Sequence, residues 1–322
     1  MGFLLRRLTQ SLVVLFAMSL LVFAGVFMVG DPVLVMIGPD ATQADIAATR
    51  ASLGLDKPLS SQYARFVSAA LRGDLGRSYA YSTPALKLVG ERMPATLELA
   101  SCAMLIAVVF GIPLGLWAGA KPGSVADRSI MTGSILGFSL PTFWIGLMLV
   151  MLFSVRLGWL PTSGRGDTVP LFGVPLSIFT ADGLRHLFLP ALNLSLFNLA
   201  LLIRLARAGT REAIGQDYVK FARAKGLSER RVIGVHVLQN ILIPIVTVMG
   251  LEFGSIIAFS VVTETIFAWP GMGKLLIDSI NVLDRPVIVA YLLVVVAMFI
   301  AINFAVDLLY ALLDPRVRTS RT

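Results

Sequence analysis

The sequence predicts an all-α integral membrane protein with six transmembrane helices, cytoplasmic N and C termini, and a small helical periplasmic cap between the first two spans. Of its 322 residues, 57% are hydrophobic and 14% are charged, and the mean hydropathy is +0.83. A soluble domain of this length needs less apolar surface for its core, so part of that surface has to face lipid. Several apolar stretches also approach or exceed the ~20 residues that cross a bilayer core of roughly 30 Å. Basic residues bracket these stretches, as topology signals do.

The first predicted span is the apolar run 12–29, which follows Arg6 and Arg7. It resembles a signal peptide, but it is too long and lacks a convincing small-residue cleavage site. We therefore expect an uncleaved helix within residues 1–30. The other five spans are the remaining long apolar stretches. They are predicted at residues 96–119, 129–154, 188–203, 241–267 and 287–309.

Lysine and arginine set the orientation, because cytoplasmic loops carry an excess of them. Segment 204–240 carries Arg204, Arg207, Arg211, Lys220, Arg223, Lys225, Arg230 and Arg231. The loop 268–286 carries only Lys274 and Arg285. The first of these segments is therefore predicted to be cytoplasmic. The basic residues at both ends of the chain place the two termini, including the tail 311–322, on the same side.

Residues 31–95 then lie outside the membrane, and their pattern predicts short helices. Ser61 is expected to cap a helix that ends at Gly73, while Ser82 and Pro84 mark a further helix start. One face of the first helix would carry Tyr63, Phe66, Val67, Ala70 and Leu71. Two roles stay open for this cap: a lid over helix ends, or a docking surface for a soluble partner.

Glycines at four-residue spacing predict close helix packing in lipid. The pattern occurs in the residues Gly111, Gly115 and Gly119, in the pair Gly133 and Gly137, and in the pair Gly250 and Gly254. Pro113, Pro141 and Pro244 fall within or at the ends of spans, where kinks are tolerated.

Several classes of function are disfavoured. A lone cysteine, Cys102, and two distant histidines, His186 and His236, supply neither a disulfide framework nor a metal or catalytic cluster. The run from Gly271 to Lys274 resembles a phosphate-binding loop but fails the pattern on both sides, so the chain itself is not expected to bind ATP. The net charge of +8 is spread around apolar segments, which favours contact with membrane lipid and not with nucleic acid.

The segment 217–233 predicts a helix, a sharp bend and a second helix. Gly226 would stop the first helix, and Ser228 would cap the next with Glu229 in its first turn. A basic loop of this kind can be only a positive-inside signal. Alternatively, the small residues Ala222, Ala224 and Gly226 beside Tyr218 and Phe221 suit insertion into a groove of another protein, with the bracketing arginines pairing acidic groups around it.

Motifs over almost the whole chain carry a resemblance to a known family. The cytoplasmic one is Tyr218-Val-Lys-Phe-Ala-Arg-Ala-Lys-Gly226-Leu-Ser228. The others are Gly73-Asp-Leu-Gly76 with Ser78, Ser139-Leu-Pro-Thr-Phe-Trp144-Ile-Gly146, Gly158-Trp-Leu-Pro161-Thr-Ser-Gly164, Glu264-Thr-Ile-Phe-Ala-Trp-Pro270-Gly-Met-Gly273, and Asp307-Leu-Leu-Tyr310 with Asp314-Pro-Arg316. Together they resemble the permease subunits of ABC importers, in the branch that serves dipeptides, oligopeptides, nickel and glutathione.

The resemblance implies a multi-pass, non-catalytic subunit of the bacterial inner membrane that takes peptides or similar small solutes from a periplasmic binding protein by alternating access. It also implies a heterodimer with a second, homologous permease and two cytoplasmic ATPase subunits, which bind ATP and Mg²⁺. Residues 96–310 would form the importer core, with 204–240 as the coupling loop. The coupling residues would be Tyr218, Phe221, Ala222, Arg223, Ala224, Lys225 and Gly226.

Three positions depart from the pattern of this family. Lys220 stands where the generic coupling motif begins with an acidic residue, and Phe259 stands where this branch usually has glycine. Glu252 replaces a residue that is usually neutral, such as glutamine. The expected translocation path contains Glu252, Phe259 and Glu264, because ionisable groups at bilayer depth are costly and tend to face water or a partner. Alternatively, Glu264 and Asp307 hold helix ends together through polar contacts.

An ion-gradient-driven secondary transporter or channel subunit is the alternative function. Such proteins commonly show an internal repeat or an intramembrane chain of charges, and no convincing repeat is found here. Peptides are the default cargo, with nickel chelates, glutathione and opine-like compounds left open.

Overall fold

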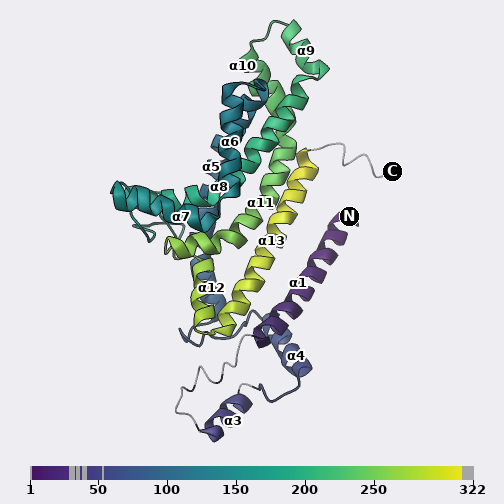
Figure 1. Cartoon of the computed structure of the whole chain (residues 1–322). Helices are drawn as coiled ribbons and strands as arrows, with labels where there is room; N and C mark the ends of the chain where they lie inside the picture. The colour runs from purple at the N-terminus through teal and green to yellow at the C-terminus, as the bar shows by residue number, and fades with distance from the viewer. Residues whose placement is uncertain (1, 29–32, 34–36, 38–41, 53, 314–322) are drawn as a thin grey trace. The chain divides into compact units, whose positions relative to one another are not determined.

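The computed structural model describes residues 2–28, 33, 37, 42–52 and 54–313. The chain divides into two compact units, residues 1–96 with 270–300, and residues 97–269 with 301–322. The described elements are nearly all helical (Figure 1). Two short strands, β1 (Val169–Leu171) and β2 (Val174–Leu176), form an antiparallel hairpin in which Val169 pairs with Leu176.

The first unit contains α1 (Gly2–Met28), α3 (Gln43–Ser52), α4 (Leu59–Ala70), the start of α5 (Ala85–Ala120), α12 (Met272–Asn281) and most of α13 (Arg285–Leu313). Aromatic contacts join α1 to α4: the Phe23 ring centroid lies 5.2 Å from that of Tyr63 and 5.7 Å from that of Phe66. The buried carboxylate of Asp284 accepts hydrogen bonds from the Ser78 hydroxyl and the backbone N–H groups of Tyr79 and Ala80.

The second unit contains the rest of α5, α6 (Val125–Ser139), α7 (Thr142–Leu149), a π-helical stretch (Val150–Arg156), α8 (Ala181–Ile214), α9 (Asp217–Ala224), α10 (Glu229–Arg231), a second π-helical stretch (Val232–Val237) and α11 (Leu238–Ile266). Helix α8 packs against α6, α7 and α11 (Figure 1). Leu202 and Ala206 lie on its buried side. They belong to a hydrophobic core cluster that also contains Ala107 of α5 and Ile241 of α11.

Among the described residues, four helices are long and apolar enough to cross a membrane: Ala85–Ala120, Ala181–Ile214, Glu229–Ile266 and Arg285–Leu308. The bent pair Val125–Ser139 and Thr142–Arg156 makes a fifth if it counts as one span, and α1 holds a shorter apolar stretch, Thr9–Gly25. The structure therefore shows an all-helical membrane protein with four or five long apolar helices.

The predicted span 129–154 is wrong as a single straight helix, because α6 and α7 meet at an angle of 105°. Pro141 causes the break. A proline restricts the residue before it to extended backbone and has no N–H to donate, and Leu140 has φ −86° and ψ 139°.

Two details of the predicted cap are also wrong. Helix α4 begins at Leu59 after Pro58, so Ser61 lies within its first turn and is not the cap, and Leu71 is highly exposed, so it does not share the packed face. The expected start after Pro84 is confirmed by α5, which begins at Ala85. That helix then continues without a break past residue 96, so the predicted boundary between cap and core falls inside one helix.

The glycine spacing predicts packing in two of three cases. A Cβ added to Gly115 would lie 2.6 Å from the Cβ of Ala206, so only glycine lets α5 and α8 approach this closely. A Cβ added to Gly250 would likewise lie too close to the Val306 side chain of α13. A Cβ on Gly133 would meet nothing within 4 Å, so the spacing around that residue marks no close helix contact.

Candidate functional site

Segment 217–237 has the predicted helix, bend and helix. Helix α9 ends at Ala224, and Gly226 adopts φ +78°, a left-handed conformation that favours glycine. Ser228 occupies the N-cap position of α10, but its side chain makes no capping hydrogen bond. The predicted bend is therefore confirmed, while the predicted capping interaction is not formed.

Helix α9 is amphipathic, and its two faces have different partners. Val219 and Ala222, three residues apart, are buried in the core cluster of the second unit, with Ala222 only 5% exposed. Tyr218 and Phe221 lie on the outer face, and Phe221 is 62% exposed. The expectation that Ala222 presents a docking surface is wrong, because the helical period places it on the side of α9 that anchors the helix to its own chain.

Charges around the bend are partly paired within the chain. Arg223 donates to Glu229 across the bend, at 2.7 Å from Nε to Oε1 and 3.2 Å from Nη2 to Oε2. This pairing raises the pKa of Arg223 and occupies the charge that was expected to reach an external acidic group. The Nζ of Lys225 lies 4.5 Å from the centroid of the Phe221 ring. Of the expected coupling residues, Tyr218, Phe221 and Lys225 therefore form an outward aromatic and basic surface.

A second ion pair fastens α6 to α8 close to this segment. Arg207 donates to Asp127, at 2.6 Å from Nε to Oδ1 and 3.0 Å from Nη2 to Oδ2. Asp127 also accepts from the backbone N–H of Gly123, and its own N–H donates to the Ser124 hydroxyl. Sequence reasoning used Arg207 only as a topology signal. The capping pattern of Ser124 followed by Asp127 was the available clue to this attachment.

A cavity of about 460 Å³ lies in the second unit beside α11. It is lined by Thr142, Leu194, Phe197, Asn198, Glu252, Ser255, Ile256, Phe259, Val262 and Thr263. Glu252 and Phe259, two of the expected path residues, are therefore brought together on it. They share a face of α11 because they are seven residues apart.

Glu264, the third expected path residue, does not line this cavity. Its side chain is fully buried, and Oε1 accepts a hydrogen bond of 3.0 Å from the Ser260 hydroxyl one turn earlier. Its carbonyl accepts from the backbone N–H of Trp269. These contacts hold the end of α11, so the helix-tying role describes Glu264 better than a path role. Asp307 lies in α13 and is likewise absent from the cavity lining.

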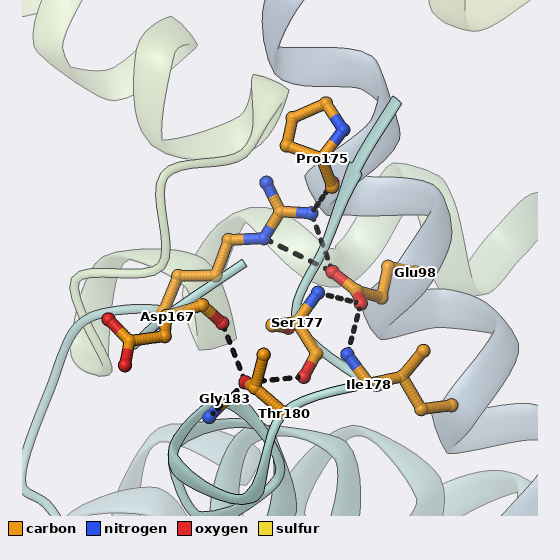
Figure 2. A network of polar contacts seen from close by, with 8 residues as sticks. Glu98, Asp167, Pro175, Ser177, Ile178, Thr180 and Gly183 are labelled. Atoms are coloured by element: carbon orange, nitrogen blue, oxygen red, sulfur yellow. Dashed lines mark hydrogen bonds and ion pairs between the residues drawn. The ribbon is translucent and has the colours of Figure 1, made fainter. Parts of the chain in front are cut away.

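A buried carboxylate that sequence reasoning did not single out organises the loop before α8 (Figure 2). Glu98 of α5 accepts from the backbone N–H groups of Ser177 and Ile178, at 2.6 and 2.8 Å. Its other oxygen accepts from Nε and Nη2 of Arg165, at 3.1 and 2.6 Å. The same Nη2 donates to the carbonyl of Pro175, which ties the β1–β2 hairpin to α5. No spacing signal could reveal this network, since its partners are 67 to 80 residues apart.

A neighbouring set of contacts caps α8. The Thr180 hydroxyl accepts from the backbone N–H of Gly183 at 2.8 Å and donates to the carbonyl of Asp167 (Figure 2). These hydrogen bonds therefore join the loop that contains Asp167 to the first turn of α8. Within the described ranges, no cluster of three or more His, Cys, Asp or Glu side chains is placed to hold a metal ion.

Comparisons with known proteins cover both halves of the chain. Residues 111–319 match the family described as "Binding-protein-dependent transport system inner membrane component", and residues 1–100 match the N-terminal family of the same components. The di/tripeptide transport system permease protein DppB of Pseudomonas aeruginosa is 44% identical, with both chains covered in full. The dipeptide transport system permease protein DppB of Escherichia coli K12 is 41% identical over 98% of each chain. The glutathione transport system permease protein GsiC of E. coli is 40% identical over 99% of each.

Solved structures agree at the level of the fold. A structure of the MetNI methionine ABC transporter in an inward-facing conformation aligns with 70% of this chain and 96% of its own, with a TM-score of 0.53 and 15% identity. The motifs spread along the chain, the bend at Gly226 and these matches agree with one another. The chain therefore belongs to the family of binding-protein-dependent transport system inner membrane components, and it is a multi-pass, non-catalytic permease subunit of a bacterial ABC importer.

Proposed function

We propose that this permease imports peptides, passing them from a periplasmic binding protein into the cytoplasm by alternating access. The support is its full-length similarity to permeases named for di/tripeptide, dipeptide and glutathione transport. It would pair with a second, homologous permease and two ATPase subunits that hold ATP and Mg²⁺. Membership of an importer family argues against the alternative of an ion-gradient-driven transporter or channel.

The outer face of α9 is the proposed contact with an ATPase subunit. The observation that carries this proposal is the exposure of Phe221 on a short helix whose opposite face, through Val219 and Ala222, is fixed in the core. An anchored helix transmits displacement to α8 and α11, because its buried residues belong to the same cluster as theirs. Exposed aromatic side chains beside a basic rim suit a partner groove with acidic groups around it.

Removing the aromatic ring tests this contact. We expect Phe221→Ala to lower peptide uptake and binding-protein-stimulated ATP hydrolysis by about tenfold or more, because a central aromatic anchor carries a large share of a small interface. Both rates would be measured in proteoliposomes with the partner subunits. Glu212→Ala, which replaces an exposed residue of α8, is the control. Wild-type rates in Phe221→Ala, with the complex assembled, would show that α9 docks without this ring.

The membrane arrangement is proposed as six spans with both termini in the cytoplasm. Two of the six spans would be α1 and the bent pair α6–α7. The apolar stretch of α1 is shorter than the other four helices, and the α6–α7 pair is interrupted by a bend. Residues 31–95 would form a periplasmic cap, as a lid or as a surface for the binding protein. The proposed divisions remain 1–30, 31–95, 96–310 and 311–322, although α5 runs through the second boundary.

Single cysteines test the orientation. In a Cys102→Ser background, Glu212→Cys and Lys121→Cys should react with a membrane-impermeant maleimide only after the inner membrane is opened. Gln43→Cys and Phe172→Cys should react in intact spheroplasts. All four side chains are exposed, so accessibility depends on the side of the membrane and not on burial. Labelling of positions 43 and 121 from the same side would contradict the proposed topology.

The cavity beside α11 is the proposed part of the translocation path in this chain. Glu252 lies at the midpoint of α11, and an ionised carboxylate at that depth costs at least ~2.5 kcal/mol if it faces lipid. A position on a cavity avoids that cost. Phe259 is 76% exposed on the same wall, where it narrows the opening more than a glycine would.

A further inference from the structure

The cavity beside α11 has one carboxyl group in its lining and no basic side chain beside it among the described residues. Glu252 is the one ionisable residue among those that line it. Within the part of the chain that the structure describes, its carboxylate has neither a hydrogen bond nor an ion pair. The other polar lining groups, on Thr142, Asn198, Ser255 and Thr263, are hydroxyls and an amide. None of the described residues that line the cavity is a lysine or arginine that could receive an anion.

The rest of the lining is polar or aromatic at several positions. Asn198 of α8, which is 5% exposed, contributes an amide to the wall. Phe197 and Phe259 also line the space, and the faces of aromatic rings attract cations.

A packing role does not account for Glu252. The glycine that packs closely on α13 is Gly250, against Val306, and two residues along a helix correspond to a rotation of about 200°. Glu252 therefore points away from that contact and shares its face with Ser255 and Phe259. The side chain occupies the cavity wall and not a helix–helix seam.

We infer that this cavity is a subsite that favours cargo with a net positive charge, through attraction between Glu252 and an alkylammonium or guanidinium side chain. The inference rests on the proposed peptide-import function. Every free peptide backbone carries both an ammonium and a carboxylate group, so a lone Glu252 attracts one end and repels the other. A lysyl or arginyl side chain adds an unbalanced attraction. The volume of about 460 Å³ lies within the range of small-ligand sites, roughly 300–1,000 Å³.

The test compares three dipeptides in proteoliposomes that contain the full importer: Lys-Ala, Ala-Ala and Asp-Ala. Glu252→Gln keeps the shape and removes the charge. Relative to wild type, the ratio of Lys-Ala to Ala-Ala uptake should fall about fivefold, the scale of one partly solvated ion pair, and the ratio of Asp-Ala to Ala-Ala should rise. The same binding protein serves both variants, so its own preferences cancel in this comparison.

Two further variants keep the result interpretable. Glu252→Asp retains the charge and should retain the wild-type order of the three peptides, and Glu91→Gln removes an exposed carboxylate elsewhere and should change no ratio. A uniform loss for all three peptides, or unchanged ratios in an assembled Glu252→Gln complex, would overturn the subsite. Failure of the wild-type complex to import any of the peptides with ATP would instead refute the proposed function, and the subsite with it.

Discussion

Replacing Glu98 by alanine should destabilise the permease by about 3–5 kcal/mol, the usual cost of removing one partner of a buried ion pair. Glu98 is 7% exposed, and the Arg165 side chain that it binds is only 11% exposed. The change leaves the guanidinium without its carboxylate, with only the Pro175 carbonyl as an acceptor, and leaves the N–H groups of Ser177 and Ile178 without their acceptor. The measurement is the temperature at which half of the detergent-purified protein loses its monodisperse peak.

A double-mutant cycle separates the ion pair from the cavity left by the deleted side chain. Glu98→Ala with Arg165→Ala removes the uncompensated charge as well, so the double variant should be more stable than the two single losses added together. Glu91→Ala on the same helix is the matched control, since Glu91 is exposed and its Lys87 partner lies 3.9 Å away in solvent. Additive losses in the cycle would show that the Glu98–Arg165 pair is not coupled.

The difference between Glu98 and Gly226 shows what the sequence could and could not predict. The bend at Gly226 depends on neighbours in the chain: a short amphipathic run followed by a glycine. The role of Glu98 depends on Arg165, 67 residues away, and the Asp127–Arg207 pair joins residues 80 apart. Such pairs exist only once the helices have packed. A single sequence therefore supplies the charges but not their partners.

Ala222 and Pro141 show a related limit. The size of Ala222 suited either a docking surface or a close contact within the chain, and only its packing against the core decides between them. Pro141 was expected to be tolerated as a kink, but the extended backbone that it imposes at Leu140 turns the chain by 105°. By contrast, Glu252 and Phe259, both expected on the translocation path, do line one cavity, and their seven-residue spacing on a long helix gives them a shared face. Their place on a path stays a prediction.

Gly115→Leu should prevent α5 and α8 from packing, and we expect it to reduce the amount of folded permease in the membrane more than tenfold. A Cβ at this position would lie 2.6 Å from both the Ala206 Cβ and the Ile203 carbonyl oxygen. Both neighbours are fixed: one is a methyl group on a helix, and the other is backbone. The helices would have to separate, and overpacking of this kind costs about 1–3 kcal/mol or more even where side chains can shift. Quantitative blotting of membranes, with size-exclusion profiles of the extracted protein, measures the loss.

The control for this change is available in the next helix. Gly133 has the same four-residue spacing to a second glycine, but a Cβ there would meet nothing within 4 Å. Gly133→Leu should therefore fold and reach the membrane at nearly the wild-type level. If Gly115→Leu were tolerated as well as Gly133→Leu, α5 and α8 could not approach as closely as the structure places them.

The two glycines differ in what faces them. On α8, Leu202, Ala206 and Thr210 repeat every four residues and face the three glycines of α5 in turn. A glycine spacing predicts a seam only when the facing helix has a matching row, and for Gly115 the row is present.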